Sequence, residues 1–340
     1  MKTLKNKLSL LIIALVAISC SSDDGDSTAS IPTVKDIYVA GFETISNNQI
    51  PKYWKNGVGT TLSTLVRGSA ESIFVSGTDV YAAGYVFLSG NGSNAVYWKN
   101  GNLINLVAST QSYATGIFVS GTDVYVCGYE MTGGKYRARY WKNGVVHSLS
   151  DGTKDAYAQD IFISGSDVYV CGREVSNINS SATAKYWKNS VAVNLSAEAF
   201  GCNATAIKVS GSDVYVSGRD SNDAVYWKNG TKTEVSTVTA GSYFQGNEIA
   251  LNGTDIYVAG WEETPGPTQA RVWKNGVATN LNNYGQANGL SVSPLGDAYV
   301  VGRDNVAGWV ARIWINGTPT TLSSAASTES DAKDVFLTYN

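Results

Sequence analysis

Short apolar runs alternate with polar turns along the chain, and one arrangement of them recurs. In its clearest form it holds apolar or aromatic segments at 117–119, 124–127, 140–142 and 145–149, with polar residues between them. The pair Asn143-Gly144 favours a two-residue hairpin, because both residues tolerate positive φ. No segment has a sustained helical period. The arrangement therefore predicts four short antiparallel strands, called strands A, B, C and D in chain order.

The same arrangement occurs seven times. An aspartate precedes strand B in each copy, and a tyrosine always follows it two residues later, as in Asp123 and Tyr125. The tryptophan of strand C recurs at intervals of 40 to 46 residues, at Trp54, Trp98, Trp141, Trp187, Trp227, Trp273 and Trp314. Four strands in a repeat of this length are typical of a β-propeller blade. We predict an all-β, seven-bladed β-propeller with four antiparallel strands per blade and the seven tryptophans as its repeated core.

The two ends of the repeat region complement one another. The first copy begins at strand B, residues 37–40, and residues 333–338 form a strand A that no strand B follows. The C-terminal strand is therefore expected to complete the first blade, which removes the open sheet edges that promote aggregation. The propeller domain is predicted to span residues 35–340.

The N-terminal residues have a different composition. Three lysines precede the apolar run Leu8–Ser19, which is too short to cross a bilayer, and Cys20 follows it. The segment Val16–Cys20 resembles a bacterial lipobox, with Ala17 where Leu is commoner; an ordinary signal peptide with an incidental Cys20 is the alternative. The resemblance implies a signal peptide at 1–19 and lipidation of Cys20.

Residues 20–34 are rich in serine and in acidic side chains, including Asp23, Asp24 and Asp26. They resemble the acidic tag that sends lipoproteins of Bacteroidota to the outer face of the outer membrane, and they also suit a solvated linker. The resemblance implies an outer-membrane, lipid-anchored and surface-exposed protein. Membrane contact is expected through the lipid anchor alone.

The repeat itself resembles known propeller repeats over residues 36–340. A strand that ends in Gly, a loop, and then an aromatic-Trp element with a turn are similar to kelch-type repeats. The Tyr-Trp adjacency and the Asn-Gly turn are closer to the HAF-type repeats of bacterial extracellular propellers. Ala-Gly, Cys-Gly or Ser-Gly stands where kelch repeats have a glycine pair. The resemblance implies a fold but not a function, because propellers host many activities.

Loop lengths distinguish the two faces of the predicted propeller. The A–B turn keeps its length in all internal copies but one, and the C–D turn never changes, whereas the B–C loop varies from 7 to 13 residues and the D–A connection also varies. Recognition is commonly placed on variable loops above a rigid scaffold. We expect ligand-binding residues on this variable face, namely Tyr113, Tyr157, Phe244, Trp261, Trp309, Arg173, Arg219 and Arg303. The alternative is that several of them only cap the spaces between blades. Tyr113 and Tyr157 are expected side by side, and Trp261 and Trp309 are expected in B–C loops as a second platform. Tyr243 and Phe244 are expected in a D–A loop.

Charge and reactive residues narrow the possible chemistry. The formal charge is −3, and becomes −6 without residues 1–19, so a nucleic-acid partner is not expected. His147 is the single histidine, which argues against a His-rich metal site or a Ser-His-Asp triad. Cys127, Cys171 and Cys202 are expected to be buried free thiols, with a disulfide as the alternative.

Six copies carry a carboxylate two residues after the glycine of strand B, namely Glu43, Glu130, Glu174, Asp220, Glu262 and Asp304. Glycosidases use two carboxylates, so this acidic ring allows a glycan hydrolase or lyase. A feature that six copies repeat is better explained by a fixed partner, such as a nearby arginine or backbone N–H.

The sequence therefore favours a cell-surface binding module for a glycan, with a surface protein as the second partner class. An adhesion scaffold and a glycan-active enzyme are the alternatives. A monomer without cofactor, metal or catalytic residues is expected.

Overall fold

The computed structural model describes residues 31–63, 67–88, 92–107, 111–176, 181–236, 243–263, 266–305 and 308–340. Residues 32–340 form one compact unit, and every regular element described in it is a β-strand. No described helix is long and apolar enough to cross a membrane. The predicted signal peptide, Cys20 and most of the predicted linker lie outside the described residues.

The strands form seven antiparallel sheets, numbered as blades 1 to 7 in ring order. Blade 1 contains β29 (Glu329–Tyr339), β1 (Val34–Ile45), β2 (Asn48–Lys55) and β3 (Val58–Thr61); blade 2 contains β4 (Arg67–Ser76), β5 (Asp79–Leu88), β6 (Gly92–Lys99) and β7 (Asn102–Asn105); blade 3 contains β8 (Ser112–Ser120), β9 (Asp123–Thr132), β10 (Lys135–Lys142) and β11 (Val145–Ser148); blade 4 contains β12 (Asp155–Ser164), β13 (Asp167–Val175), β14 (Ser181–Lys188) and β15 (Val191–Asn194), with β16 (Ala199–Phe200) beside β14.

The last three blades repeat the same order. Blade 5 contains β17 (Asn203–Ser210), β18 (Asp213–Asp220), β19 (Asp223–Lys228) and β20 (Thr231–Glu234); blade 6 contains β21 (Tyr243–Asn252), β22 (Asp255–Glu263), β23 (Gln269–Lys274) and β24 (Val277–Asn280); blade 7 contains β25 (Gly285–Val292), β26 (Ala298–Asn305), β27 (Trp309–Ile315) and β28 (Thr318–Thr321).

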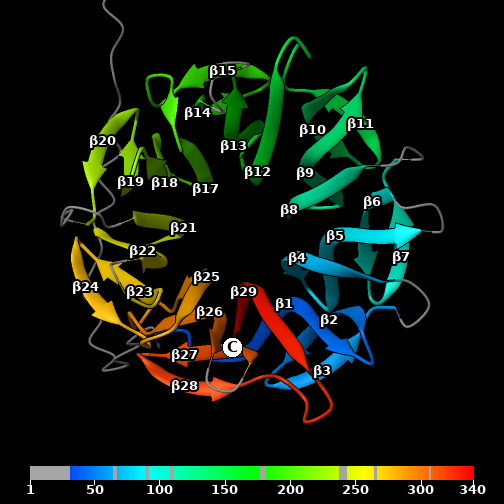
Figure 1. The fold of residues 1–340 in the computed structure, drawn as a ribbon, viewed down its shortest axis with the longest axis vertical. Coiled ribbons are helices and arrows are strands. Elements are labelled where there is room, and N and C mark those ends of the chain that lie inside the picture. Colours follow the sequence, from blue (N-terminus) through cyan, green and yellow to red (C-terminus); the bar gives the residue numbers. More distant parts are fainter. Residues whose placement is uncertain are drawn as a thin grey trace, which may run out of the picture. The chain divides into compact units, whose positions relative to one another are not determined.

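The blades stand in a ring around a central axis (Figure 1). Their first strands, β29, β4, β8, β12, β17, β21 and β25, face the axis, and each contacts the first strand of the next blade. The C-terminal strand β29 pairs with β1 from Tyr339 beside Val34 to Glu329 beside Thr44. The predicted fold class is confirmed, including the completion of the first blade by the C-terminal strand.

The repeated tryptophans fill the space between blades. All seven are buried, and Trp187 of blade 4 packs against Tyr125 and Cys127 of blade 3. The glycine of strand B recurs for a different reason. A Cβ atom on Gly128 would lie 1.9 Å from the carbonyl oxygen of Tyr113. Strands A and B of a blade therefore approach one another too closely for a side chain at this position.

The repeated aspartate holds the turns of one face together. The side-chain amide of Asn143 donates to Asp123 at 2.8 Å and its carbonyl oxygen accepts from the N–H of Val124 at 2.9 Å. Lys142 pairs with the same aspartate at 2.8 Å and lies over the ring of Tyr125. Asn143 and Gly144 have φ of 49° and 79°, as the hairpin turn requires. This cluster explains why Tyr-Trp-Lys-Asn-Gly recurs.

The strands are longer than predicted, and this changes where several residues lie. The predicted strand A at 117–119 is β8, which begins at Ser112 and includes Tyr113. The apolar pattern located only its outer half, because a polar residue interrupts the inner half. Cys127, Cys171 and Cys202 are buried and free.

Candidate binding site

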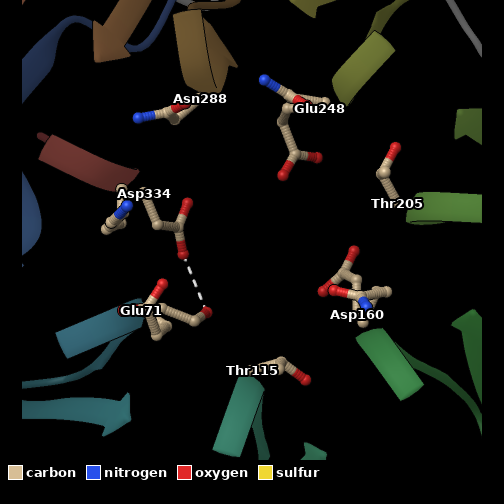
Figure 2. A pocket seen from close by; sticks show the side chains of 11 residues that line it. Glu71, Thr115, Asp160, Thr205, Glu248, Asn288 and Asp334 are labelled. Atoms are coloured by element: carbon tan, nitrogen blue, oxygen red, sulfur yellow. Dashed lines mark hydrogen bonds between the residues drawn. The ribbon is translucent and has the colours of Figure 1, made fainter. Parts of the chain in front are cut away.

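A β-bulge interrupts the innermost strand of every blade at the same point. In β8 the pairing shifts between Ala114 and Gly116, so Thr115 is the extra residue. The corresponding residues of the other blades are Glu71, Gln159, Thr205, Asn247, Asn288 and Lys333. Bulges bend a strand and redirect its side chains. The seven bulge residues line a central cavity of about 250 Å³, together with Ser72, Asp160, Glu248 and Asp334 (Figure 2).

Most of these polar groups bind the neighbouring blade. Each of four bulge residues donates to a backbone carbonyl oxygen of the next blade: Thr115 to Ala158 (3.0 Å), Thr205 to Gly246 (2.6 Å), Asn247 to Ala287 (2.7 Å) and Asn288 to Ala332 (2.9 Å). Glu71 and Gln159 have no hydrogen-bond partner within the described ranges. The cavity wall is therefore largely a belt that joins blades, and two of its side chains remain available to a ligand.

Three carboxylates follow the bulges, and they differ from blade to blade. Asp334 accepts from the hydroxyl of Ser72 at 2.8 Å and from the N–H of Ile73 at 2.9 Å, so it joins blade 1 to blade 2. Asp160 accepts from the N–H of Ile207 at 2.9 Å and so joins blade 4 to blade 5. Figure 2 shows both carboxylates and that of Glu248 directed toward the same space.

Lys208 is the cation of this group. Its Nζ lies 2.9 Å from Glu248 and 3.5 Å from Asp160. Burial raises the pKa of Glu248 to about 8, and the neighbouring carboxylates add to that effect while Lys208 opposes it. Burial also raises the pKa of Asp334. In the described residues, no group of three or more His, Cys, Asp or Glu side chains is placed to hold a metal ion.

The far end of the central space is apolar. Phe74 lies 4.8 Å from Phe118 and 4.7 Å from Phe336, measured between ring centroids, and Phe162 continues the row. These rings line a second cavity of about 200 Å³ with Lys208. Because strand A runs from the variable face toward the A–B turns, this apolar row lies toward the A–B turns and the polar belt lies toward the variable face.

The ends of β5, β8, β9, β10 and β12 on the variable face carry a row of tyrosines, the aromatic arc, made of Tyr85, Tyr113, Tyr129, Tyr136 and Tyr157. Consecutive ring centroids lie 5.0 Å (Tyr85–Tyr113), 5.1 Å (Tyr113–Tyr129) and 4.9 Å (Tyr129–Tyr157) apart. Tyr136 contacts both Tyr129 and Tyr157. All five are partly exposed, and burial raises the pKa of Tyr85 to about 12.

The aromatic arc corrects one expectation. Tyr113 and Tyr157 were expected side by side, and the ring of Tyr129 lies between them. Trp261 and Trp309 were expected in B–C loops as one platform, but they lie in β22 and β27. Each contacts a nearby tyrosine: Trp261 stacks on Tyr243 at 5.3 Å between ring centroids, and Trp309 lies tilted against Tyr284 at 5.5 Å, so they form two separate pairs.

Phe244 is a core residue and not a surface contact. Only 3% of it is exposed, and it packs with Ile249 and Trp273. Side chains alternate between the two faces of a strand, and Phe244 points inward in β21 beside the partly exposed Tyr243. The sequence had placed both residues in a loop.

The three arginines predicted on this face lie over aromatic rings. Arg173 is 5.0 Å from the ring centroid of Tyr157, Arg219 is 4.1 Å from that of Tyr243, and Arg303 is 4.3 Å from that of Trp309. Arg303 also donates to Gln286 and lies 3.7 Å from both Glu329 and Asp331.

Each member of the predicted acidic ring has a basic partner in its own blade. The pairs are Glu43–Lys52, Glu130–Arg139 (2.9 Å), Glu174–Lys185 (2.6 Å), Asp220–Lys232 (2.9 Å), Glu262–Arg271 and Asp304–Arg312 (2.9 Å). Blade 2 has buried Val86 and Val96 at the positions of such a pair. The acids therefore belong to the blade framework.

Sequence reasoning missed the belt of bulge residues. Its signal is a small residue, then a polar one, then an aliphatic residue two positions later, as in Ala114-Thr115-Gly116-Ile117 and Ala158-Gln159-Asp160-Ile161. The polar residue breaks the apolar alternation, so the segment resembles a loop until the copies are compared.

No protein-family model matches this chain, and no curated protein matches it. Among the solved structures that resemble it in fold are two of peptidases. A Mycobacterium tuberculosis puromycin-hydrolysing peptidase is 12% identical with a TM-score of 0.56, over 86% of this chain and 53% of the other. A structure from work on two prolyl endopeptidases is 13% identical with a TM-score of 0.51, over 92% of this chain and 50% of the other.

This chain spans about half the length of each peptidase chain, and identities this low show the propeller fold alone. The kelch-type and HAF-type resemblance of the repeats stays a prediction from the sequence.

Proposed function

We propose that this propeller is a glycan-binding module that holds its ligand across the aromatic arc. The observation that carries the proposal is the arc itself, five partly exposed tyrosines in ring-to-ring contact over blades 2 to 4. Partly exposed aromatic groups on a rigid scaffold are favoured binding anchors.

The chemistry of the arc suits sugars. A pyranose ring has a flat face of C–H groups that packs on an aromatic ring, and its hydroxyl groups need hydrogen-bond partners. The polar belt begins two residues after Tyr113 and Tyr157 in β8 and β12, and Glu71 and Gln159 line the cavity with hydrogen-bonding capacity that no other described residue uses. Aromatic contact and polar contact are the two elements of such a site.

We further propose that the protein is displayed on the outer face of a bacterial outer membrane by a lipid on Cys20, as the lipobox-like segment and the acidic residues after it suggest. Catalysis is not proposed, because the acids of the repeated ring are each engaged by a cation. A surface protein as ligand and a passive adhesion scaffold remain the competing functions.

A glycan array tests the proposed function, with the full chain in detergent and product analysis of every ligand that binds. The double variant Tyr113→Ala, Tyr157→Ala should weaken binding by about 1–2 kcal/mol for each ring in calorimetric titration, with little change in melting temperature. Tyr339→Ala is the control, since it removes a tyrosine that is 39% exposed at the opposite end of β29. Absence of any glycan ligand, or release of cleaved products, would reject this function.

Anchoring is tested separately by acyl labelling. Cys20→Ser should abolish labelling, and replacing Asp23, Asp24 and Asp26 by Ala should keep the label but remove the protein from protease attack on intact cells. Labelled Cys20→Ser protein would exclude the lipobox.

A further inference from the structure

Two arginines share a cavity beside the aromatic arc, between blades 4 and 5. Arg173 of β13 and Arg219 of β18 line a space of about 320 Å³ together with Tyr157, Phe200 and Cys202. Tyr157 also belongs to the arc, so the cavity and the arc are continuous. Phe200 is 64% exposed, which leaves an apolar side chain at the edge of the cavity.

Neither arginine has an anionic partner within the described ranges. Among the described residues, the buried Nε of Arg173 has no hydrogen-bond partner, and Arg219 donates through Nε to the carbonyl oxygen of Gly201 at 2.6 Å. The nearest acid in sequence, Asp220, is held by Lys232 at 2.9 Å. This contrasts with Arg139, Arg271 and Arg312, which each pair with a carboxylate of their own blade.

Leaving two guanidinium groups unpaired and largely buried is unfavourable. Only 8% of Arg219 is exposed. Burial first, and then the charge of Arg173, lower the pKa of Arg219 to about 10. Arg219 therefore stays cationic at neutral pH, and the charge of Arg173 repels it. An anion that contacts both would remove the repulsion and restore lost hydrogen bonds, because guanidinium groups bind carboxylate and sulfate oxygens in pairs.

The surroundings hold the two groups in place for such contacts. Arg173 lies over Tyr157 and Arg219 over Tyr243, so each guanidinium plane is supported by a ring. Gly201 has φ of 82°, and a Cβ atom there would lie 2.3 Å from a terminal nitrogen of Arg219. A side chain at position 201 would displace the guanidinium group, and glycine leaves room for it.

We propose that this arginine pocket, formed by Arg173 and Arg219, binds the acidic substituent of a polysaccharide, a carboxylate or a sulfate ester, while the neighbouring sugars lie on the aromatic arc. The inference rests on the proposed function and names its ligand class. The positive charge of the arginine pocket is a local property, since the chain as a whole carries a formal charge of −3.

The test compares dextran, carboxymethyl dextran and dextran sulfate, and also neutral, uronate-bearing and sulfated glycans on the array. The expected result is at least tenfold tighter binding of one acidic class than of its neutral counterpart. Arg173→Gln should abolish that preference, as should Arg173→Gln with Arg219→Gln, so each should lower the affinity for acidic glycans at least tenfold more than the affinity for neutral ones. Lys188→Gln is the control, because it removes one positive charge from blade 4 at the opposite face.

The outcomes separate the two proposals. Preference for uronate-bearing ligands assigns the pocket to carboxylate, and preference for sulfated ligands assigns it to sulfate. Equal binding of neutral and acidic glycans would overturn the arginine pocket and leave the aromatic arc intact. If the arginine variants bind acidic glycans as wild type does, the acidic group lies elsewhere and the inference fails. If no glycan binds, the proposed function fails with it.

Discussion

Arg139 donates through Nε to Glu130 at 2.9 Å, from β10 to β9, and both side chains are largely buried. In blade 2 the equivalent positions hold Val86 and Val96, which are completely buried. One protein therefore uses both an ion pair and an apolar pair for the same place in its blade. The desolvation of a buried ion pair offsets much of its attraction, so an apolar pair of matched shape can replace it.

The valine pair provides a prediction. Glu130→Val leaves Arg139 buried without its counter-ion and should lower the free energy of unfolding by about 3–5 kcal/mol. The double variant Glu130→Val, Arg139→Val should recover to within about 1 kcal/mol of wild type. Urea unfolding of the three proteins checks this. A double variant as unstable as the single one would show that the ion pair has a role that valines cannot replace.

The aspartate clusters at the A–B and C–D turns, on the face opposite the variable loops, predict a stability that depends on acid. Hydrogen bonds from Lys142 first, and then from Asn143, lower the pKa of Asp123, and similar Lys and Asn partners act on Asp36, Asp79, Asp167, Asp213 and Asp255. A pKa below that of the unfolded chain gives stability above about pH 4 that is lost as the pH falls through the folded value.

Asp123→Asn should therefore melt below wild type at neutral pH, and the two melting temperatures should converge as the pH falls from about 5 to about 2. Asp297→Asn is the matched control, because blade 7 has Ile315 in the place of the lysine. Melting curves at a series of pH values test this. A constant difference at every pH would mean that the aspartate acts through the geometry of the turn and not through its charge.

The properties that the sequence revealed are those that every blade repeats. Trp141, Asp123 and Asn143 recur in fixed order, and each has a local cause in packing or turn geometry, so strand order and closure followed from them. The candidate site lies where the blades differ in sequence. A residue that occurs in one blade alone has no equivalent in the others from which its position can be inferred. Phe244 and Tyr243 show the difficulty, since adjacent aromatic residues point in opposite directions once β21 extends through both.

The β-bulges account for most of the structural features that the sequence did not predict. Thr115 is polar and lies inside a buried strand, so its segment does not look like a strand by apolar pattern. Its hydrogen bond goes to another blade, to the carbonyl oxygen of Ala158, and no local pattern encodes that partner. The place of Tyr129 in the aromatic arc was not predicted for the same reason, because contacts between blades place its ring between those of Tyr113 and Tyr157.

Ring closure provides a third prediction. Deleting residues 334–340 removes most of the pairing of β29 with β1 and the bonds from Asp334 to blade 2. The opened ring exposes strand edges and apolar blade faces, so the variant should aggregate or lose its cooperative melting transition. Removal of Asn340 alone is the control and should change little. A cooperative transition at the wild-type temperature would show that the last strand is dispensable.

The fourth prediction concerns Glu248, the carboxyl group that burial perturbs most clearly. Its pKa is raised from 4.5 to about 8 in the folded protein. A carboxyl group with a raised folded pKa contributes stability that is complete below the unfolded pKa and is lost as the pH rises through the folded one. Wild type should therefore lose stability between about pH 4.5 and 8.

Glu248→Gln imitates the protonated side chain at every pH. Its melting temperature should be close to that of wild type at pH 5 and above it at pH 8, because only wild type must ionise a buried carboxyl group near Asp160 and Asp334. Glu71→Gln serves as the matched control, since Glu71 lines the same cavity, and it should retain the wild-type pH dependence. If Glu248→Gln is less stable than wild type at pH 8, Lys208 holds an ionised Glu248 in a net favourable pair, and the central cavity is stabilised by its charges.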